Sequence, residues 1–179
     1  MDTVISPSIP PKNRRFRLAH CIAFSLALLA LPAAGLAGEI QAWLLLLPNA
    51  ASPATILSTD RTECDRLTKQ GWKISGTGLL QTDPGPGLGD VTRMMKKDGN
   101  VVDRAIEADP VIVGKRRAEG YVIEGVLGYA ALQSAPGGIA VRRYTKGDHA
   151  LWLIGKADLD WAQQQQWKED GVAFWLMPQ

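Results

Sequence analysis

Cys64, His149 and a few charged side chains are the groups beyond residue 37 of this sequence that could carry chemistry. Cys64 could act as a nucleophile if His149 accepted its proton. When three similar stretches of the chain are aligned, however, Cys64 shares a column with Val113 and Leu159. A column of apolar residues indicates a buried position, where cysteine behaves as a small hydrophobic residue. We therefore expect Cys64 to fill the core, with a thiol- or histidine-dependent hydrolase as an alternative.

His149 stands beside Asp148, a few residues after Arg142 and Arg143. These four could bind a polar ligand or a carboxylate, and the alternative is a histidine held at a strand edge by local hydrogen bonds. Neighbouring residues of a strand point to opposite faces, so the pair does not suggest a catalytic triad. One histidine and one cysteine beyond residue 37 are too few for the usual transition-metal sites. We expect no catalytic site, no metal and no cofactor.

Trp161 is the aromatic residue that departs from the repeated pattern. Sugar-binding modules use exposed aromatic rings as platforms, because an aromatic ring has a large apolar face. Trp72 and Trp167 occupy one repeated aromatic column, which predicts that they lie in the core. Trp161 shares its column with Arg66 and Lys115, which predicts that it is exposed on a helix. Trp161 is therefore the best candidate for a ligand contact, unless it covers a neighbouring loop.

The first 37 residues have the features of a secretory signal peptide. A basic cluster precedes the uncharged run CIAFSLALLAL (21–31), and small residues follow as far as Ala37. The apolar run is short and is interrupted by proline, unlike a membrane span. We predict a signal peptide at 1–37 and a periplasmic or secreted domain at 38–179, with a retained anchor as the alternative. Membrane contact is expected only through the signal segment.

The charge balance of the domain excludes one class of partner. The signal segment holds four of the 20 Lys and Arg residues and one of the 18 Asp and Glu residues, so 16 basic and 17 acidic residues remain. A nucleic-acid partner would need clustered positive charge, so we expect none. Cys21 lies in the signal segment, which leaves Cys64 alone and predicts no internal disulfide. The domain must therefore be held together by its hydrophobic core.

Three stretches of 29 residues align without gaps, at 53–81, 102–130 and 148–176. Their offsets, 49 and 46 residues, are typical of repeat architectures. One column is apolar, one is aromatic and one is glycine in every copy: Leu57, Ile106 and Trp152; Trp72, Tyr121 and Trp167; Gly76, Gly125 and Gly171. We infer three repeats, at about 39–83, 89–135 and 138–178.

Each copy predicts one short helix between strands. Asp60, Asp109 and Gly155 are acceptable helix N-caps, and Gly71 and Gly120 fall where helix C-caps belong. The helices are therefore expected at about 61–70, 110–119 and 156–165. One such unit cannot bury its own apolar face, and three-fold closure removes exposed sheet edges. The sequence predicts an all-β, β-trefoil-like closed barrel of three repeats, each with one short helix.

The third copy, VRRYTKGDHALWLIGKADLDWAQQQQWKEDGVAFWL (141–176), resembles a bacterial secreted repeat family of unknown function. The residues that carry the resemblance are Arg143, Tyr144, Asp148, His149, Trp152, Trp167, Gly171, Phe174 and Trp175. The resemblance implies a β-trefoil-like fold, and family members occur alone or appended to exported hydrolases. The second copy has Val102-Asp103, and the first has Pro53-Ala54, where the family has Asp-His. The chain would thus be a divergent member without three equivalent Asp-His pairs.

These observations favour a non-catalytic exported binding module for envelope or extracellular carbohydrate. The expected contact residues are Trp161, His149, Asp148, Arg142 and Arg143. A structural or inhibitor-like protein-interaction domain is the second interpretation, and a hydrolase is the third.

Overall fold

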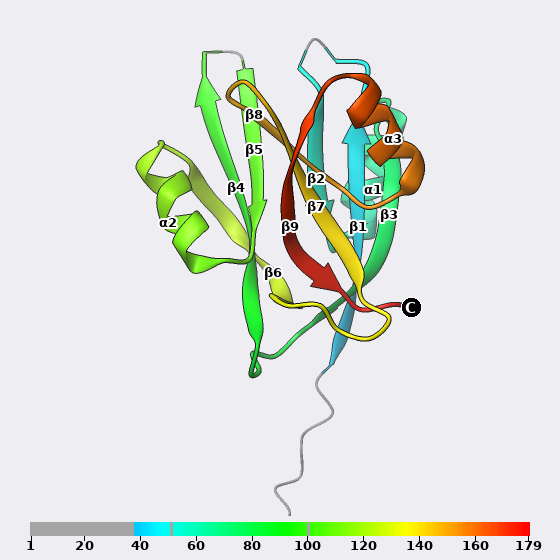
Figure 1. Cartoon of the computed structure of the whole chain (residues 1–179), viewed down its shortest axis with the longest axis vertical. Helices are drawn as coiled ribbons and strands as arrows, with labels where there is room; N and C mark the ends of the chain where they lie inside the picture. The colour runs from blue at the N-terminus through cyan, green and yellow to red at the C-terminus, as the bar shows by residue number, and fades with distance from the viewer. Residues whose placement is uncertain (1–37, 51, 100) are drawn as a thin grey trace, which may run out of the picture. The chain divides into compact units, whose positions relative to one another are not determined.

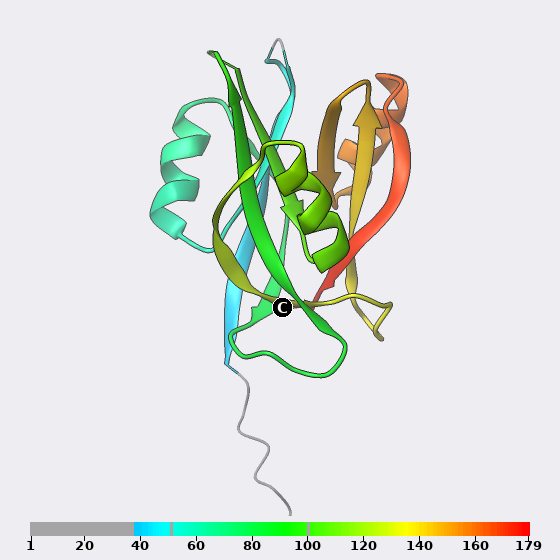
Figure 2. The same cartoon turned by 90° about the vertical axis from the view of Figure 1, so that its left-hand side faces the viewer.

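The computed structural model of the chain describes residues 38–50, 52–99 and 101–179 (Figures 1 and 2). It is mostly β-strand with three short helices, in agreement with the all-β class predicted from the sequence. The predicted signal peptide, 1–37, lies outside the described residues. Among the described residues, no helix has the length and apolar character needed to cross a membrane.

The order strand, strand, helix, strand occurs three times along the described chain. The first unit consists of β1 (Glu39–Leu47), β2 (Ala54–Ser58), α1 (Arg61–Lys69) and β3 (Lys73–Gln81). The second consists of β4 (Leu88–Asp98), β5 (Val101–Glu107), α2 (Pro110–Ala118) and β6 (Val122–Ala131). The third consists of β7 (Ile139–Lys146), β8 (His149–Leu153), α3 (Lys156–Gln164) and β9 (Lys168–Leu176). Each helix lies within one residue of the range predicted from the sequence.

Each unit is a three-stranded antiparallel sheet with its first strand in the middle. The strand orders are β2-β1-β3, β5-β4-β6 and β8-β7-β9. The helix connects the second strand of a unit to its third strand. Because the first and second strands form a hairpin, the end of the first strand, the hairpin turn and the start of the second strand lie together. The possible ligand contacts described below come largely from this part of each unit.

The three sheets meet without forming a closed barrel, so the predicted closed trefoil barrel is wrong. The third strands touch through single register pairs, Gln81 with Tyr129 and Ala131 with Trp175, and through one isolated bridge, Leu79 with Met177. A barrel wall would need continuous ladders between neighbouring units. The sheet is therefore open, although three similar units lie side by side.

The glycine that recurs in every repeat lies at an irregularity in the pairing of the first and third strands. The pairing of the first and third strands changes register close to Gly76, Gly125 and Gly171 in the three units. A β-bulge bends the strand and interrupts its ladder. Each third strand pairs with the next unit only near its end, after this glycine. The repeated glycine therefore marks the position of the bulge in each unit.

The second strands of the three units pack against one another in the main core. Leu57, Ile106 and Trp152, one from each second strand, are all completely buried. The backbone N–H of Trp152 donates a hydrogen bond of 3.0 Å to the hydroxyl of Thr55, which links β8 to β2. The apolar column of the alignment is therefore the contact between units.

The aromatic column is also buried, as predicted. The side chains of Trp72, Tyr121 and Trp167 are less than a tenth exposed, and each lies just after the helix of its unit. Trp72 packs in a smaller cluster with Cys64 and Leu67, so Cys64 fills the core as expected.

The N-terminal caps of the helices differ between the units. The carboxylates of Asp60 and Asp109 accept hydrogen bonds of 2.8 Å from the backbone N–H of Thr62 and Val111, the second residues of α1 and α2. The N-cap of α3 is Gly155, which has no side chain to accept such a bond. A Cβ atom at Gly155 would lie 2.7 Å from the backbone oxygen of Ser75 in β3. Close approach between α3 and β3 therefore excludes a capping side chain.

Gly155→Asp is expected to destabilise the protein, although aspartate is a preferred N-cap. The contact with β3 should cost about 1–3 kcal/mol, the usual range for an overpacked position. Asp109→Gly is the matched change at α2, and it should cost only a few tenths of a kcal/mol. Urea unfolding of both variants measures the two effects. A rise in stability for Gly155→Asp would contradict the close approach.

Candidate functional site

Two neighbouring pockets open on either side of His149. The first, which we call the His–Trp pocket, has a volume of about 490 Å³. It lies between the β1–β2 turn of the first unit and the β7–β8 hairpin and α3 of the third. Its lining residues are Pro48, Asn49, Ala50, Ser52, Pro53, Lys146, His149, Trp161, Gln165 and Trp167. Two indole rings and several neutral hydrogen-bonding groups therefore face one cavity.

Lys146 and His149 are held in place by local contacts. The Lys146 ammonium donates a hydrogen bond of 2.8 Å to the backbone oxygen of Gln165 at the end of α3. The Ser52 hydroxyl lies 3.5 Å from Nδ1 of His149, across the boundary between the first and third units. His149 itself is exposed. Its imidazole can therefore meet a ligand while its position is limited by Ser52.

Trp161 lines the His–Trp pocket, but it is less exposed than predicted. Arg66 and Lys115, which share its column, are exposed, whereas Trp161 is half-buried. The indole packs against a cluster that includes Leu46 of the first unit and Trp167. The alignment predicted an exposed Trp161 because it compares positions within single units. In the structure, the neighbouring unit covers part of the ring. The rest of the ring remains available to the pocket.

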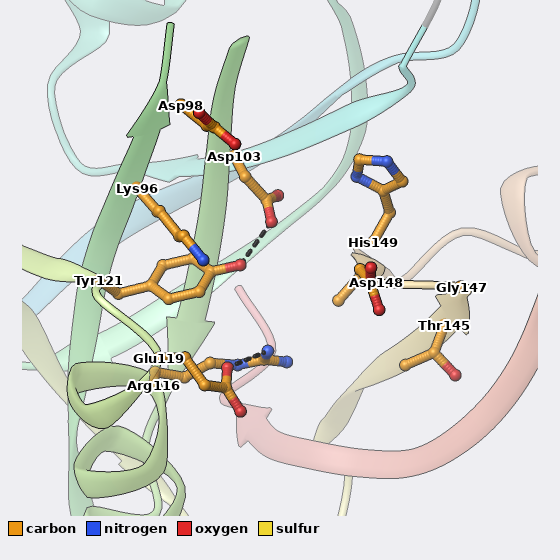
Figure 3. A pocket seen from close by; sticks show the side chains of 11 residues that line it. Lys96, Asp98, Asp103, Arg116, Glu119, Tyr121, Thr145, Gly147, Asp148 and His149 are labelled. Atoms are coloured by element: carbon orange, nitrogen blue, oxygen red, sulfur yellow. Dashed lines mark hydrogen bonds and ion pairs between the residues drawn. The ribbon is translucent and has the colours of Figure 1, made fainter.

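The second pocket, which we call the charged pocket, has a volume of about 590 Å³ (Figure 3). It lies between the β4–β5 hairpin and α2 of the second unit and the β7–β8 hairpin of the third. Its lining residues are Lys96, Asp98, Asp103, Arg116, Glu119, Tyr121, Thr145, Gly147, Asp148, His149 and Ala150. Figure 3 shows Lys96, Asp103 and Tyr121 on one side, with Asp148 and His149 on the other.

Tyr121 organises one wall of the charged pocket. Its hydroxyl donates a hydrogen bond to the carboxylate of Asp103. The Lys96 ammonium lies 6.0 Å from the centre of the ring and the Arg116 guanidinium lies 5.5 Å from it. Burial, together with the hydrogen bond and negative charge of Asp103, raises the pKa of Tyr121, so the phenol stays protonated. Tyr121 therefore serves as a donor that fixes the orientation of Asp103.

Asp148 and His149, both predicted from the sequence as contact residues, line the charged pocket together. The sequence argument against a triad placed the two residues on one strand, with side chains on opposite faces. In the structure β8 begins at His149, and Asp148 belongs to the preceding turn. Strand alternation does not apply to a turn residue. The two side chains can therefore contribute to the same cavity.

Arg142 and Arg143 line neither of these two pockets. Arg143 forms an ion pair of 3.0 Å with Glu107 of the second unit and another of 2.9 Å with Asp170. Arg142 pairs with Glu169 in the neighbouring strand. The structure thus brings His149 together with Trp161 and with Asp148, while it uses Arg143 to connect two units.

Cys64 and His149 lie in different parts of the structure. Cys64 is 1 % exposed on the buried face of α1 and belongs to the cluster of Leu67 and Trp72, whereas His149 lines the two pockets. Burial raises the pKa of the Cys64 thiol above its ordinary value. In the described part of the chain, no group of three His, Cys, Asp or Glu residues is arranged to hold a metal ion.

Sequence reasoning missed the pocket residues that come from the second unit and from the hairpin ends. These include Lys96, Asp103, Glu119, Tyr121, Lys146 and Gln165. A signal for one of them was present, because Asp103 occupies the column of His149 in the alignment. The turn residues of the first unit gave no such signal, since their role depends on contact with the third unit.

Comparison of the chain with protein-family models, with curated proteins and with solved structures finds no match.

Proposed function

We propose that this chain is a non-catalytic, exported binding module that holds an envelope or extracellular carbohydrate in the His–Trp pocket. The observation that carries the proposal is the position of Trp161 and His149, two residues that depart from the repeat, in the wall of one cavity. An apolar ring can pack against the C–H face of a sugar, while neutral donors and acceptors meet its hydroxyl groups. Asn49, Ser52 and Gln165 supply such groups beside the indole.

The resemblance to a secreted repeat family is part of the same proposal. The three units with one order of elements support it, and so does the position of the signal-like segment before the first strand. We propose a divergent member in which the third unit holds the ligand, because His149 and Trp161 both belong to that unit.

Trp161→Ala is expected to weaken the binding of carbohydrate at least tenfold, because its half-buried ring is more exposed than that of Trp167, the other indole in the pocket. The measurement is titration of the exported protein with soluble oligosaccharides of the cell envelope, including the disaccharide of N-acetylglucosamine and N-acetylmuramic acid. Trp43→Ala is the matched control, since Trp43 is also half-buried but lies below the Arg61 guanidinium, away from the lining of this pocket. Thermal unfolding checks that both variants are folded.

Unchanged affinity in the Trp161→Ala variant would contradict the proposed site. If no oligosaccharide binds to the folded protein, the carbohydrate proposal fails. A protein partner whose binding is lost in both Trp161→Ala and His149→Ala would then support the interaction domain instead.

A further inference from the structure

The two pockets occupy equivalent places in successive units. In the β4–β5 hairpin, Lys96 is paired with Asp103, and in the β7–β8 hairpin, Lys146 is paired with His149. In the alignment of the second and third copies, Glu119 corresponds to Gln165 at the end of the helix, and Tyr121 corresponds to Trp167. All eight residues line the pockets, four in each: Lys96, Asp103, Glu119 and Tyr121 in the charged pocket, and Lys146, His149, Gln165 and Trp167 in the His–Trp pocket. The same four positions therefore line a pocket in two units, and the side chains at these positions differ.

Each pocket is completed by the hairpin turn of a neighbouring unit. The charged pocket receives Gly147, Asp148 and His149 from the third unit, and the His–Trp pocket receives residues 48–50, 52 and 53 from the first. His149 is the residue common to both linings. His149 lines the His–Trp pocket of its own unit and also the charged pocket of the second unit. A ligand that passes His149 can therefore occupy both cavities.

The charged pocket suits a ligand that carries both signs of charge. Arg116 is compensated by Glu119 at 3.0 Å and by Glu107 at 3.9 Å. The Asp103 carboxylate accepts the hydrogen bond of Tyr121. Among the described lining residues, Lys96, Asp98 and Asp148 form no ion pair within 4.0 Å, and Lys96 and Asp148 stand on opposite walls (Figure 3). A carboxylate can meet Lys96 while an ammonium meets Asp148.

The His–Trp pocket presents a different surface. Its wall consists of indole rings, prolines, amides and hydroxyls, and Lys146 is its only fixed charge among the described lining residues. Such a wall suits a neutral, hydroxyl-rich ring more than a zwitterion. The contrast between the two pockets therefore indicates a ligand with one sugar part and one charged part.

We propose that the ligand is a glycopeptide, with its sugar in the His–Trp pocket and its zwitterionic peptide end in the charged pocket. His149 lies at the junction of the two parts. The sugar half of this inference rests on the proposed function, and the peptide half rests on the charged pocket. Two linked contacts raise affinity because the second contact forms within an already bound complex.

Three soluble probes test the proposal on the exported protein by calorimetric titration. They are the N-acetylglucosamine–N-acetylmuramic acid disaccharide, a peptide of alanine, glutamate and diaminopimelate, and the muropeptide that joins the two. We expect the muropeptide to bind at least tenfold more tightly than the disaccharide. Lys96→Gln should abolish this advantage and leave the affinity for the disaccharide unchanged.

Lys97→Gln is the matched control, because Lys97 is the next residue of β4 and does not line the charged pocket. It should retain the advantage of the muropeptide. Trp161→Ala should weaken the disaccharide and the muropeptide by the same factor.

The outcomes distinguish this inference from the proposed function. If the disaccharide binds and the peptide adds no affinity, the glycopeptide inference is overturned while the carbohydrate proposal stands. Equal behaviour of Lys96→Gln and Lys97→Gln would also overturn it. If neither the disaccharide nor the muropeptide binds, both proposals fail, whereas binding of the peptide alone would refute the sugar half.

Discussion

Trp152→Ala is expected to lower the free energy of unfolding by about 3–5 kcal/mol, the usual cost of removing a buried aromatic side chain. Trp152 is completely buried in β8, within the core cluster that joins the three units. Its removal leaves a cavity that several strands would have to close, and a close-packed interior relaxes only in part. Urea unfolding followed by circular dichroism measures the loss.

Trp152→Phe separates the loss of volume from the loss of the indole N–H. The Nε1 atom of Trp152 is buried and has no hydrogen-bond partner among the described residues. Phenylalanine removes this unsatisfied donor and keeps most of the apolar contact, so its cost should be well below half that of alanine. Trp43→Ala, at a half-buried position, should also cost less. A smaller loss for Trp152→Ala than for Trp43→Ala would be inconsistent with the core described here.

Arg143→Ala is expected to lower the free energy of unfolding by about 3 kcal/mol at neutral pH, because it removes the nearer of the two cations paired with the buried Glu107 carboxylate. Glu107 is 1 % exposed, and after the loss of Arg143 the nearest remaining cation is Arg116 at 3.9 Å. Arg142→Ala is the matched control. The side chains of Arg142 and Glu169 are each 37 % exposed, so the loss of that pair should cost at most about 1 kcal/mol.

The cost of Arg143→Ala should depend on pH. Burial raises the pKa of Glu107 above its ordinary value of 4.5, although Arg143 and Arg116 oppose the rise. A raised pKa means that the folded state binds the proton more tightly, so this contribution to stability is complete below pH 4.5 and is lost as pH rises through the folded-state pKa. Loss of Arg143 raises the pKa of Glu107 further.

Unfolding free energies measured between pH 4.5 and pH 7 test this pH dependence. The difference between wild type and Arg143→Ala should be greatest at pH 7 and should shrink as Glu107 becomes protonated. The Glu107→Gln, Arg143→Ala double variant should recover part of the loss at neutral pH, because no charge remains buried. A pH-independent cost, or one equal to that of Arg142→Ala, would rule out the ion pair as the source.

The helices were the most predictable part of the fold because their signals are local. Asp60 and Asp109 were predicted as N-caps, and both accept the expected backbone hydrogen bonds. Gly71 and Gly120 follow their helices with φ of 92° and 94°, the left-handed region that glycine adopts without strain. In the third unit Gln166 takes this place with φ of 62°. A cap depends on a few adjacent residues, so the sequence contains the information needed to place it.

The candidate site was only partly predictable. His149 and Trp161 were identified because they depart from the repeated columns, and the structure places both in the His–Trp pocket. Arg143 was predicted as a contact because it is a charged residue near His149, yet it forms an ion pair with Glu107 of the second unit. A single unit does not reveal which of its polar residues face a neighbouring unit. Departure from the repeat therefore indicated His149 and Trp161 as candidate ligand contacts. Only the contacts between units showed that these two line a pocket and that Arg143 forms a structural ion pair.

The sequence by itself determined three similar units, their short helices and the buried aromatic and apolar columns, because these follow from caps and from the hydrophobic pattern within about 30 residues. Only the tertiary structure decided that the sheet stays open, since neighbouring units pair through single residues near the ends of their third strands. It also decided which hairpin turn completes each pocket. Both outcomes depend on pairing between residues far apart in the chain, and such pairing is set by the packing of whole units against one another.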